Sequence, residues 1–314
     1  MKQALYAWNT RIDQYFHDNG FEKCTYEHAL YLKKEADGSM LLACLYVDDL
    51  IFIGNNPAMF KDFKRSMVQE FEMTAIGLMA HFLGIEVAQR KDGIFISQSG
   101  YAKEILKRYG IENCNPVNTP VDSGVELRKC TKAVDVDPTY FKSLVGSLRY
   151  LTCTRPGILY GVGLINRYME TPDQLHLYAA KRILRYIKRT VDDGLFYKPT
   201  NNFKLVGYSD SDWGCKLDER KRTTGFTFFV GDTAFTWSFK KQAIVTLSTC
   251  EAKYVAANSV VCHAIWLRNM LKHLGFPQEK PTEIYVDNHS AIALANNPVY
   301  HEKSKHIDTH YHFI

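Results

Sequence analysis

Two adjacent aspartates, Asp48 and Asp49, lie inside a strongly apolar stretch that reads CLYVDDLIFIG over residues 44–54. The flanking residues are mainly β-branched, aromatic or aliphatic, which predicts two strands with the aspartates at the tip of a hairpin. Two carboxylates at one tip need solvent, hydrogen bonds or a cation to meet their charge. Oxygen ligands at a tight turn suit Mg²⁺, the ion that phosphoryl transfer on nucleotides uses. For a bare pair of acids, the alternative interpretation is a polar, exposed turn.

A second group of acids ends the strands expected in the last third of the chain. Asp210 ends a strand predicted over 205–210, and Asp287 ends another predicted over 283–287. A hairpin over 224–238 and a helix over 247–274 separate them, and a short helix follows at 290–295. This order collects carboxylates at strand ends, as in nucleases that hold paired metal ions. Asp287 alone would suit a helix cap, but its place beside Asp210 in a shared layout favours a metal ligand.

Other elements must position these acids. A helix is predicted to begin at Pro57 with Asn56 as its cap, and its aromatic stripe is expected to pack on the hairpin sheet. A second hairpin is expected over 82–97, with its turn at 91–93, followed by a helix over 101–109. Residues 111–137, which contain Pro116 and Pro120, are the expected linker.

A helical block is predicted beyond the linker, over 140–151 and 172–191. Its second helix packs apolar residues on one side and carries basic residues on the others, among them Lys181, Arg182, Arg185 and Lys188. Such a helix is usually a solvated face. Because the chain also carries the hairpin with Asp48 and Asp49, contact of this helix with nucleic-acid phosphates is as good an interpretation as a solvated face.

Composition narrows the class of protein. The chain has 314 residues, is 46% hydrophobic and 23% charged, and has a net charge of +5, which indicates a globular protein of two domains. This charge permits binding to a polyanion without requiring it. The eight cysteines form no CxxC pair, which argues against a zinc module and favours reduced thiols. Without an apolar span of about 18 residues or a secretory signal, the expected location is intracellular, cytoplasmic or nuclear, with no membrane partner.

Strings along nearly the whole chain carry a resemblance to a known family. They include CLYVDDLIFIGNN, FLGIEV, SLVGSLRYLTCTRP, HLYAAKRILRYIK, GYSDSDWG, TWSFKKQAIVTLSTCEA, IYVDN and SKHID, in this order. The sequence resembles the C-terminal part of a copia-type retrotransposon Pol polyprotein, in which reverse transcriptase is followed by ribonuclease H. The resemblance implies a fold of the α+β or α/β class in three parts. These are a partial palm and thumb over 1–122, a linker and helical connection over 123–199, and a C-terminally truncated ribonuclease H-like mixed sheet with flanking helices over 200–314.

The resemblance also implies chemistry. Asp48 and Asp49 would be catalytic metal ligands of the polymerase, and Asp210 and Asp287 those of the ribonuclease H, with Mg²⁺ as the cofactor. The implied activities are RNA-directed DNA synthesis and hydrolysis of RNA in RNA–DNA hybrids. The implied partners are a primer-template and a hybrid, and the oligomeric state is left open.

The chain departs from the family's pattern at important places. It has Lys253 in Glu251-Ala252-Lys253-Tyr254, where the family usually has the ribonuclease H glutamate. Glu251 is a poor substitute, because two residues along a helix turn a side chain by about 200°. The family's further polymerase aspartate falls before residue 1, and its last ribonuclease H helix would follow residue 314. We therefore expect neither activity, and whether Asp212, Glu251 or Asp308 joins a metal site is left open.

Three hypotheses follow from these observations. The first is a working ribonuclease H with Asp210 and Asp287 as metal ligands. The second is a non-catalytic module that binds nucleic acid through its basic helices. The third, which the departures favour, is a reading frame decayed from a transposon that folds in part and has no activity of its own.

Overall fold

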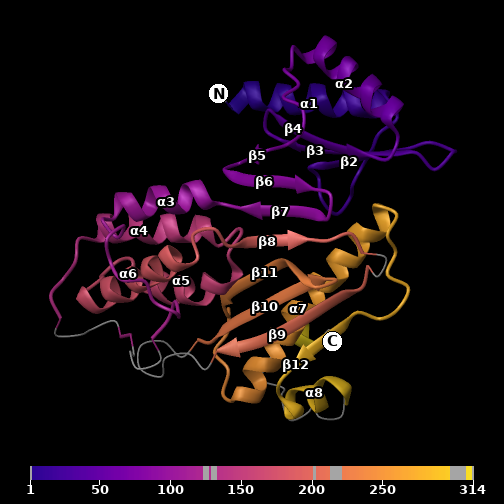
Figure 1. Cartoon of the computed structure of the whole chain (residues 1–314). Coiled ribbons are helices and arrows are strands. Elements are labelled where there is room, and N and C mark those ends of the chain that lie inside the picture. The colour runs from indigo at the N-terminus through magenta and orange to yellow at the C-terminus, as the bar shows by residue number, and fades with distance from the viewer. Residues whose placement is uncertain are drawn as a thin grey trace. The chain divides into compact units, whose positions relative to one another are not determined.

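A computed structural model of the protein describes residues 2–122, 127–128, 133–200, 203–212, 221–297 and 309–312. The chain forms two compact units, one of Met1–Met79 with Ile265–Glu279, the other of Ala80–Ala264 with Lys280–Ile314. Helices and sheets occur in both units (Figure 1), which confirms the expected mixture of α and β structure at that level. The finer division into three segments stays a prediction.

The first unit contains an antiparallel sheet and two helices that pack on it. The sheet order is β1-β2-β3-β4, with bounds β1 Glu22–Lys23, β2 Leu30–Lys34, β3 Met40–Tyr46 and β4 Asp49–Gly54. The helices are α1, Lys2–Asp18, and α2, Pro57–Phe71. Their apolar faces meet the sheet in a core that includes Ile12, Phe16, Leu41, Phe63 and Met67. This core holds the β3–β4 hairpin in place.

Helix α2 begins as the sequence predicts. The Asn56 side chain accepts hydrogen bonds from the backbone N–H groups of Ala58 and Met59, and Pro57 occupies the first turn. Phe60 lies at the edge of the predicted stripe, 37% exposed, with its ring 4.6 Å from that of Phe52. The expected packing of α2 on the hairpin is therefore confirmed.

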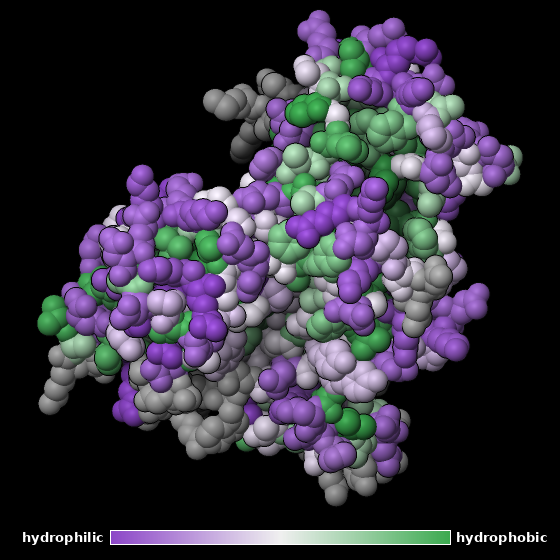
Figure 2. Space-filling view, viewed as in Figure 1, coloured by the Kyte–Doolittle hydropathy of each residue, from purple (hydrophilic) through white to green (hydrophobic). Residues whose placement is uncertain are grey.

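The second unit begins with another antiparallel sheet and a group of helices. The sheet order is β5-β6-β7-β8, with bounds β5 His81–Phe82, β6 Ile85–Arg90, β7 Gly93–Ser97 and β8 Gly194–Tyr197. The helices are α3 Ser99–Arg108, α4 Pro138–Leu151, η1 Pro156–Ile158, α5 Leu159–Ile165, η2 Asn166–Tyr168 and α6 Gln174–Arg189. Their buried faces form one core around Ile105, Leu144 and Ile183. The outer surfaces of α3, α4 and α6 are mostly hydrophilic (Figure 2), as amphipathic helices require.

A mixed sheet completes the second unit. Its order is β11-β10-β9-β12, with bounds β9 Leu205–Asp212, β10 Thr223–Val230, β11 Thr233–Lys241 and β12 Glu283–Val286. β12 pairs with β9 in parallel, whereas the other pairs are antiparallel. Helix α7, Thr249–His273, covers one face of this sheet through its first part, where His263 lies against Phe226 and the buried Phe228. Helix α8, His289–Asn296, follows β12, and η4 is Thr309–His312.

Two local predictions were wrong in detail, and one helix was not foreseen. The strand expected over 82–90 is broken at Leu83 and Gly84, both with positive φ, because a turn between β5 and β6 docks its Leu83 carbonyl on the Tyr150 hydroxyl. The expected turn at 91–93 is one residue shorter, since Gly93 already pairs with Arg90. The short helix α5 was not expected, because its seven residues are apolar or glycine on every side. Such a segment lacks the alternation of apolar and polar faces that predicts a helix.

Candidate active site

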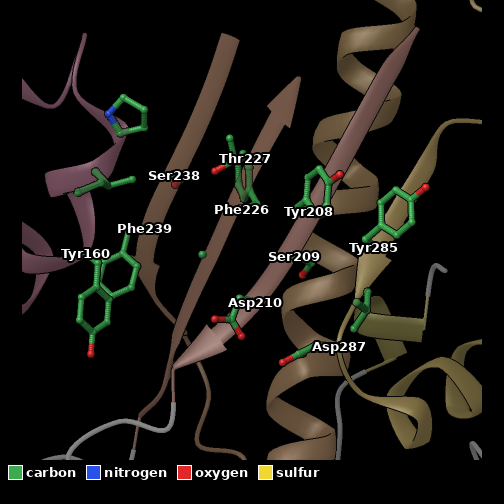
Figure 3. A pocket seen from close by; sticks show the side chains of 14 residues that line it. Tyr160, Tyr208, Ser209, Asp210, Phe226, Thr227, Ser238, Phe239, Tyr285 and Asp287 are labelled. Atoms are coloured by element: carbon green, nitrogen blue, oxygen red, sulfur yellow. The ribbon is translucent and has the colours of Figure 1, made fainter. Parts of the chain in front are cut away.

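Neighbouring parallel strands bring Asp210 and Asp287 together. Ser209 of β9 pairs with Val286 of β12, so Asp210 and Asp287 are the next residues along the two strands. Because the two strands are parallel, both carboxylates lie toward the carboxyl end of the pair. The strand predicted to end at Asp210 continues to Asp212. Figure 3 shows the two side chains close together at one end of a pocket, one from each strand. Asp287 does not cap α8, because the Asn288 side chain accepts the hydrogen bond from the Ala291 N–H at 2.8 Å.

Lys253 of α7 connects the two aspartates. Its ammonium Nζ donates to Asp210 Oδ1 at 3.1 Å and also to Asp287 Oδ1. The Lys253 side chain is only 11% exposed, whereas those of Asp210 and Asp287 are 73% and 65% exposed. Burial lowers the pKa of Lys253, but its hydrogen bonds to the two carboxylates more than offset this, and the net pKa is raised. The ammonium therefore stays charged at neutral pH.

The start of α7 decides which side chain reaches the aspartates. Ser248 accepts a hydrogen bond from the Glu251 N–H at 3.1 Å, as a helix cap does. The Glu251 carboxylate turns back and accepts from the Leu247 N–H at 2.7 Å. Lys253, two residues further along the helix, faces the sheet edge instead. The different directions of positions 251 and 253 agree with the helical geometry expected from the sequence.

This donor set does not fit a divalent cation. Mg²⁺ is held by oxygen ligands, usually carboxylates and water in octahedral geometry. Here an ammonium points at the carboxylate oxygens that would be its ligands, and like charges repel. Over the described part of the chain, no group of three or more His, Cys, Asp or Glu side chains is arranged to hold a metal ion. We therefore derive no metal-dependent step from this site.

An open pocket of about 730 Å³ extends from the aspartates along the sheet (Figure 3). Tyr208 and Tyr285 stack in it with ring centroids 5.1 Å apart and planes 18° apart. On the other side of the pocket, Phe239 and Tyr160 meet edge to face, with centroids 5.3 Å apart. Sequence reasoning missed the tyrosines, although each lies two residues before its aspartate, the spacing that puts both on one sheet face.

Asp48 and Asp49 belong to the other unit, where they form the tip of the β3–β4 hairpin. Tyr46 pairs with Asp49, which leaves Val47 and Asp48 as the turn, and both aspartates are exposed. The predicted hairpin is therefore confirmed, and β3 ends at Tyr46. Val47 has a φ of 57° and is a β-branched residue in the left-handed region, which sequence reasoning did not foresee.

The basic residues of α6 hold another part of the chain. Lys188 Nζ donates to the Cys114 carbonyl at 2.7 Å, and Arg185 Nε donates to the Asn115 carbonyl at 2.7 Å. Arg182 donates to Thr119 Oγ1 at 2.9 Å and forms an ion pair with Asp122 at 3.1 Å. Lys181 is exposed. Three of the four basic side chains predicted to meet nucleic acid thus bind residues 114–122 of the linker instead, and a phosphate-binding role for them stays a prediction.

Other predicted residues are not all described. The side chain of Asp212 and the whole of Asp308 lie outside the described residues. Glu251 lies in the first turn of α7, where its carboxylate binds the Leu247 N–H.

Comparisons with known proteins relate this chain to reverse transcriptases and transposon polyproteins. Residues 1–123 match the family of reverse transcriptase (RNA-dependent DNA polymerase). The retrovirus-related Pol polyprotein from transposon TNT 1-94 of Nicotiana tabacum is 33% identical over all of this chain and 24% of its own length. The corresponding polyprotein from transposon RE1 of Arabidopsis thaliana is 34% identical over all of this chain and 21% of its own length. An uncharacterized mitochondrial protein of Arabidopsis thaliana is 34% identical over 71% of this chain and 92% of its own.

These relatives define the class as retroelement proteins related to reverse transcriptase. The chain belongs to the Pol family of copia-type retrotransposons. It spans about a quarter of the length of the two polyproteins that it matches. Among the described residues, no helix is both long enough and apolar enough to cross a membrane.

Proposed function

We propose that this chain is a reverse transcriptase and ribonuclease H fragment whose ribonuclease H-like site does not cleave RNA. The observation that carries the proposal is the ammonium of Lys253 between Asp210 and Asp287. In a two-metal nuclease, cations held by carboxylates at this edge would orient the attacking water and stabilise the leaving oxygen. A fixed ammonium supplies one charge where two divalent ions are needed, and it occupies one oxygen of each aspartate that would bind them.

The order of elements supports the ribonuclease H part of the proposal. The sequence predicts three strands, a helix, a strand and a helix here, and the resemblance implies a mixed sheet with flanking helices; the sheet is mixed because β12 runs parallel to β9. Asp210 lies two residues before the end of the first strand of that layout, and Asp287 directly follows the fourth strand. By the same analogy, residues 1–122 correspond to part of a palm and thumb, with Asp48 and Asp49 at the palm hairpin.

We do not propose polymerase activity for this chain. Asp48 and Asp49 are two exposed carboxylates on adjacent residues, and in-line transfer of a nucleotide needs metal ions held by a complete ligand set. Within the part of the chain that the structure describes, no third His, Cys, Asp or Glu completes a metal-binding group with them. A primer-template and an RNA–DNA hybrid are the partners we propose for the ancestral retrotransposon protein from which this fragment derives.

Nucleic-acid binding without cleavage is the second candidate. Exposed Lys181 and the net charge of +5 favour it, whereas the engagement of Arg182, Arg185 and Lys188 with the linker disfavours it. Binding through phosphates would weaken steeply as salt rises. Salt-dependent binding of a hybrid would support this candidate, and no binding at low salt would exclude it.

The test is a cleavage assay on a hybrid whose RNA strand is labelled, with Mg²⁺ present. The unmodified chain should cleave no faster than the chain carrying Asp210→Asn. Lys253→Glu should gain Mg²⁺ binding, and any cleavage it shows should vanish when Asp210→Asn is added. Mg²⁺-dependent cleavage by the unmodified chain that Asp210→Asn abolishes would refute the proposal.

A further inference from the structure

The turn that carries Asp48 and Asp49 is held in an unfavourable backbone conformation. Val47 has a φ of 57°, where a β-branched side chain crowds the backbone. Such residues persist only when their surroundings impose the conformation. Here the side chains around it give little support, because Val47 is 48% exposed and Tyr46 is 52% exposed. The turn therefore needs a contact from outside the hairpin.

Trp8 supplies that contact. Its indole Nε1–H donates to the Val47 carbonyl at 2.6 Å, across 39 residues of sequence. The carbonyl of Val47 belongs to the peptide that leads into Asp48, so its direction sets the plane of that peptide and the direction in which the Asp48 side chain leaves the backbone. A rotation of this peptide would move both carboxylates. The indole thus fixes the peptide whose orientation matters most for the pair.

The indole is itself held by the two helices of the unit. The Trp8 ring meets Phe71 of α2 edge to face, with centroids 5.3 Å apart. Phe71 in turn meets Tyr15 of α1 edge to face, with centroids 5.0 Å apart. This aromatic chain links α1, α2 and the turn. The orientation of the donor is therefore set by helix packing and does not depend on the turn itself.

We infer that Trp8 is a positioning residue for the Asp48–Asp49 turn: it keeps Val47 in the left-handed conformation and thereby sets the direction of the two carboxylates. This role is separate from the ribonuclease H-like site and from its proposed loss of activity. It also explains why a turn without a glycine is compatible with this hairpin.

The test uses Trp8→Phe, which keeps an aromatic ring against Phe71 and removes the N–H donor. Amide hydrogen exchange is measured over residues 46–50 by NMR. We expect exchange there to rise about fivefold, the change expected for one hydrogen bond of ordinary net strength, with exchange in the rest of the unit unchanged. Trp266→Phe is the matched control, because the Trp266 indole also donates to a backbone carbonyl in this unit, that of Tyr26, at 2.8 Å. It should leave residues 46–50 unchanged.

Rescue separates positioning from general stability. Glycine adopts a positive φ at no steric cost, so in a Val47→Gly background Trp8→Phe should raise exchange by less than twofold. An unchanged exchange rate in Trp8→Phe, a uniform rise throughout the unit, or an equal rise in the Val47→Gly background would each overturn the inference. If Trp8→Phe does not fold, indole N–H exchange in the unmodified chain tests the inference instead. The Trp8 indole N–H should exchange as slowly as that of Trp266. Exchange as fast as that of free tryptophan would overturn the inference.

Discussion

Replacing Lys253 by glutamate should make the stability of the protein depend on Mg²⁺. In the unmodified chain the ammonium donates to Asp210 and Asp287 and occupies the space next to their oxygens. Lys253→Glu removes one positive charge and adds one negative charge, so three carboxylates would meet at the sheet edge. A divalent cation is then the most effective way to offset their repulsion.

The expected magnitudes follow from burial and charge. Each hydrogen bond of a charged group contributes about 1.5–3 kcal/mol when it is buried, and the high exposure of the two aspartates reduces this contribution. We expect Lys253→Gln to lower the free energy of unfolding by about 2 kcal/mol. Lys253→Glu should lower it by about 1 kcal/mol more without Mg²⁺, because of the added repulsion. With a dissociation constant of about 1 mM, 10 mM Mg²⁺ would return about 1.4 kcal/mol to this variant.

The assay is urea unfolding with EDTA and with 10 mM Mg²⁺, at constant ionic strength. Lys240→Glu is the control, because it makes the same charge change at an exposed position of β11. The unmodified chain and the control should change by less than about 0.3 kcal/mol between the two conditions, a difference typical of nonspecific screening. Lys253→Gln, which has two carboxylates and no ammonium at this edge, should respond less than Lys253→Glu. An Mg²⁺ response of the unmodified chain as large as that of Lys253→Glu would refute the argument that Lys253 excludes the cation.

Three further outcomes are expected. Gly84→Ala should destabilise by about 3 kcal/mol, because its Cβ would strike the Tyr150 hydroxyl at a φ of +75°. Gly38→Ala, at a φ of +84° in open space, should cost about 1 kcal/mol. Equal losses of the two variants in urea unfolding would contradict this difference. Burial lowers the pKa of His263 below its ordinary 6.5, so the folded state favours the neutral ring; its stabilising contribution is present above that pH and is lost as the pH falls through the folded pKa. The loss of stability on acidification should therefore be smaller in His263→Phe, and an unchanged pH dependence would contradict it. Arg185→Ala should lower the free energy of unfolding by about 1.5 kcal/mol through its lost hydrogen bond to the linker. Lys181→Ala, at an exposed position, should change it by less than about 0.5 kcal/mol. A larger loss for Lys181→Ala than for Arg185→Ala would show that the linker contact contributes little.

Local patterns predicted much of the fold. Periodicity and helix capping act within a few residues, so the sequence was enough to predict three local features. These are the hairpin at Asp48 and Asp49, the start of α2 at Asn56-Pro57 and the succession of strands around Asp210. The direction of Lys253 toward Asp210 and Asp287 was also expected, since helical geometry and the resemblance together specify which face position 253 occupies.

The remaining features depend on contacts between segments distant in sequence. The break at Leu83 requires Tyr150 to meet it, and nothing in residues 82–90 reveals that partner. The basic side chains of α6 looked suited to phosphates, but Arg185 and Lys188 donate to carbonyls 70 or more residues away, such as that of Asn115. The strained φ of Val47 likewise rests on Trp8, 39 residues earlier. Such pairings arise from the assembled fold, which local propensity does not specify.

The most direct test of the central claim is the rate of RNA cleavage by the unmodified chain on an RNA–DNA hybrid in Mg²⁺. The Lys253 ammonium between Asp210 and Asp287 predicts a rate equal to that of the Asp210→Asn variant, with and without EDTA. A rate well above that variant, abolished by EDTA, would show that the site holds its metal ions despite Lys253 and would contradict the account.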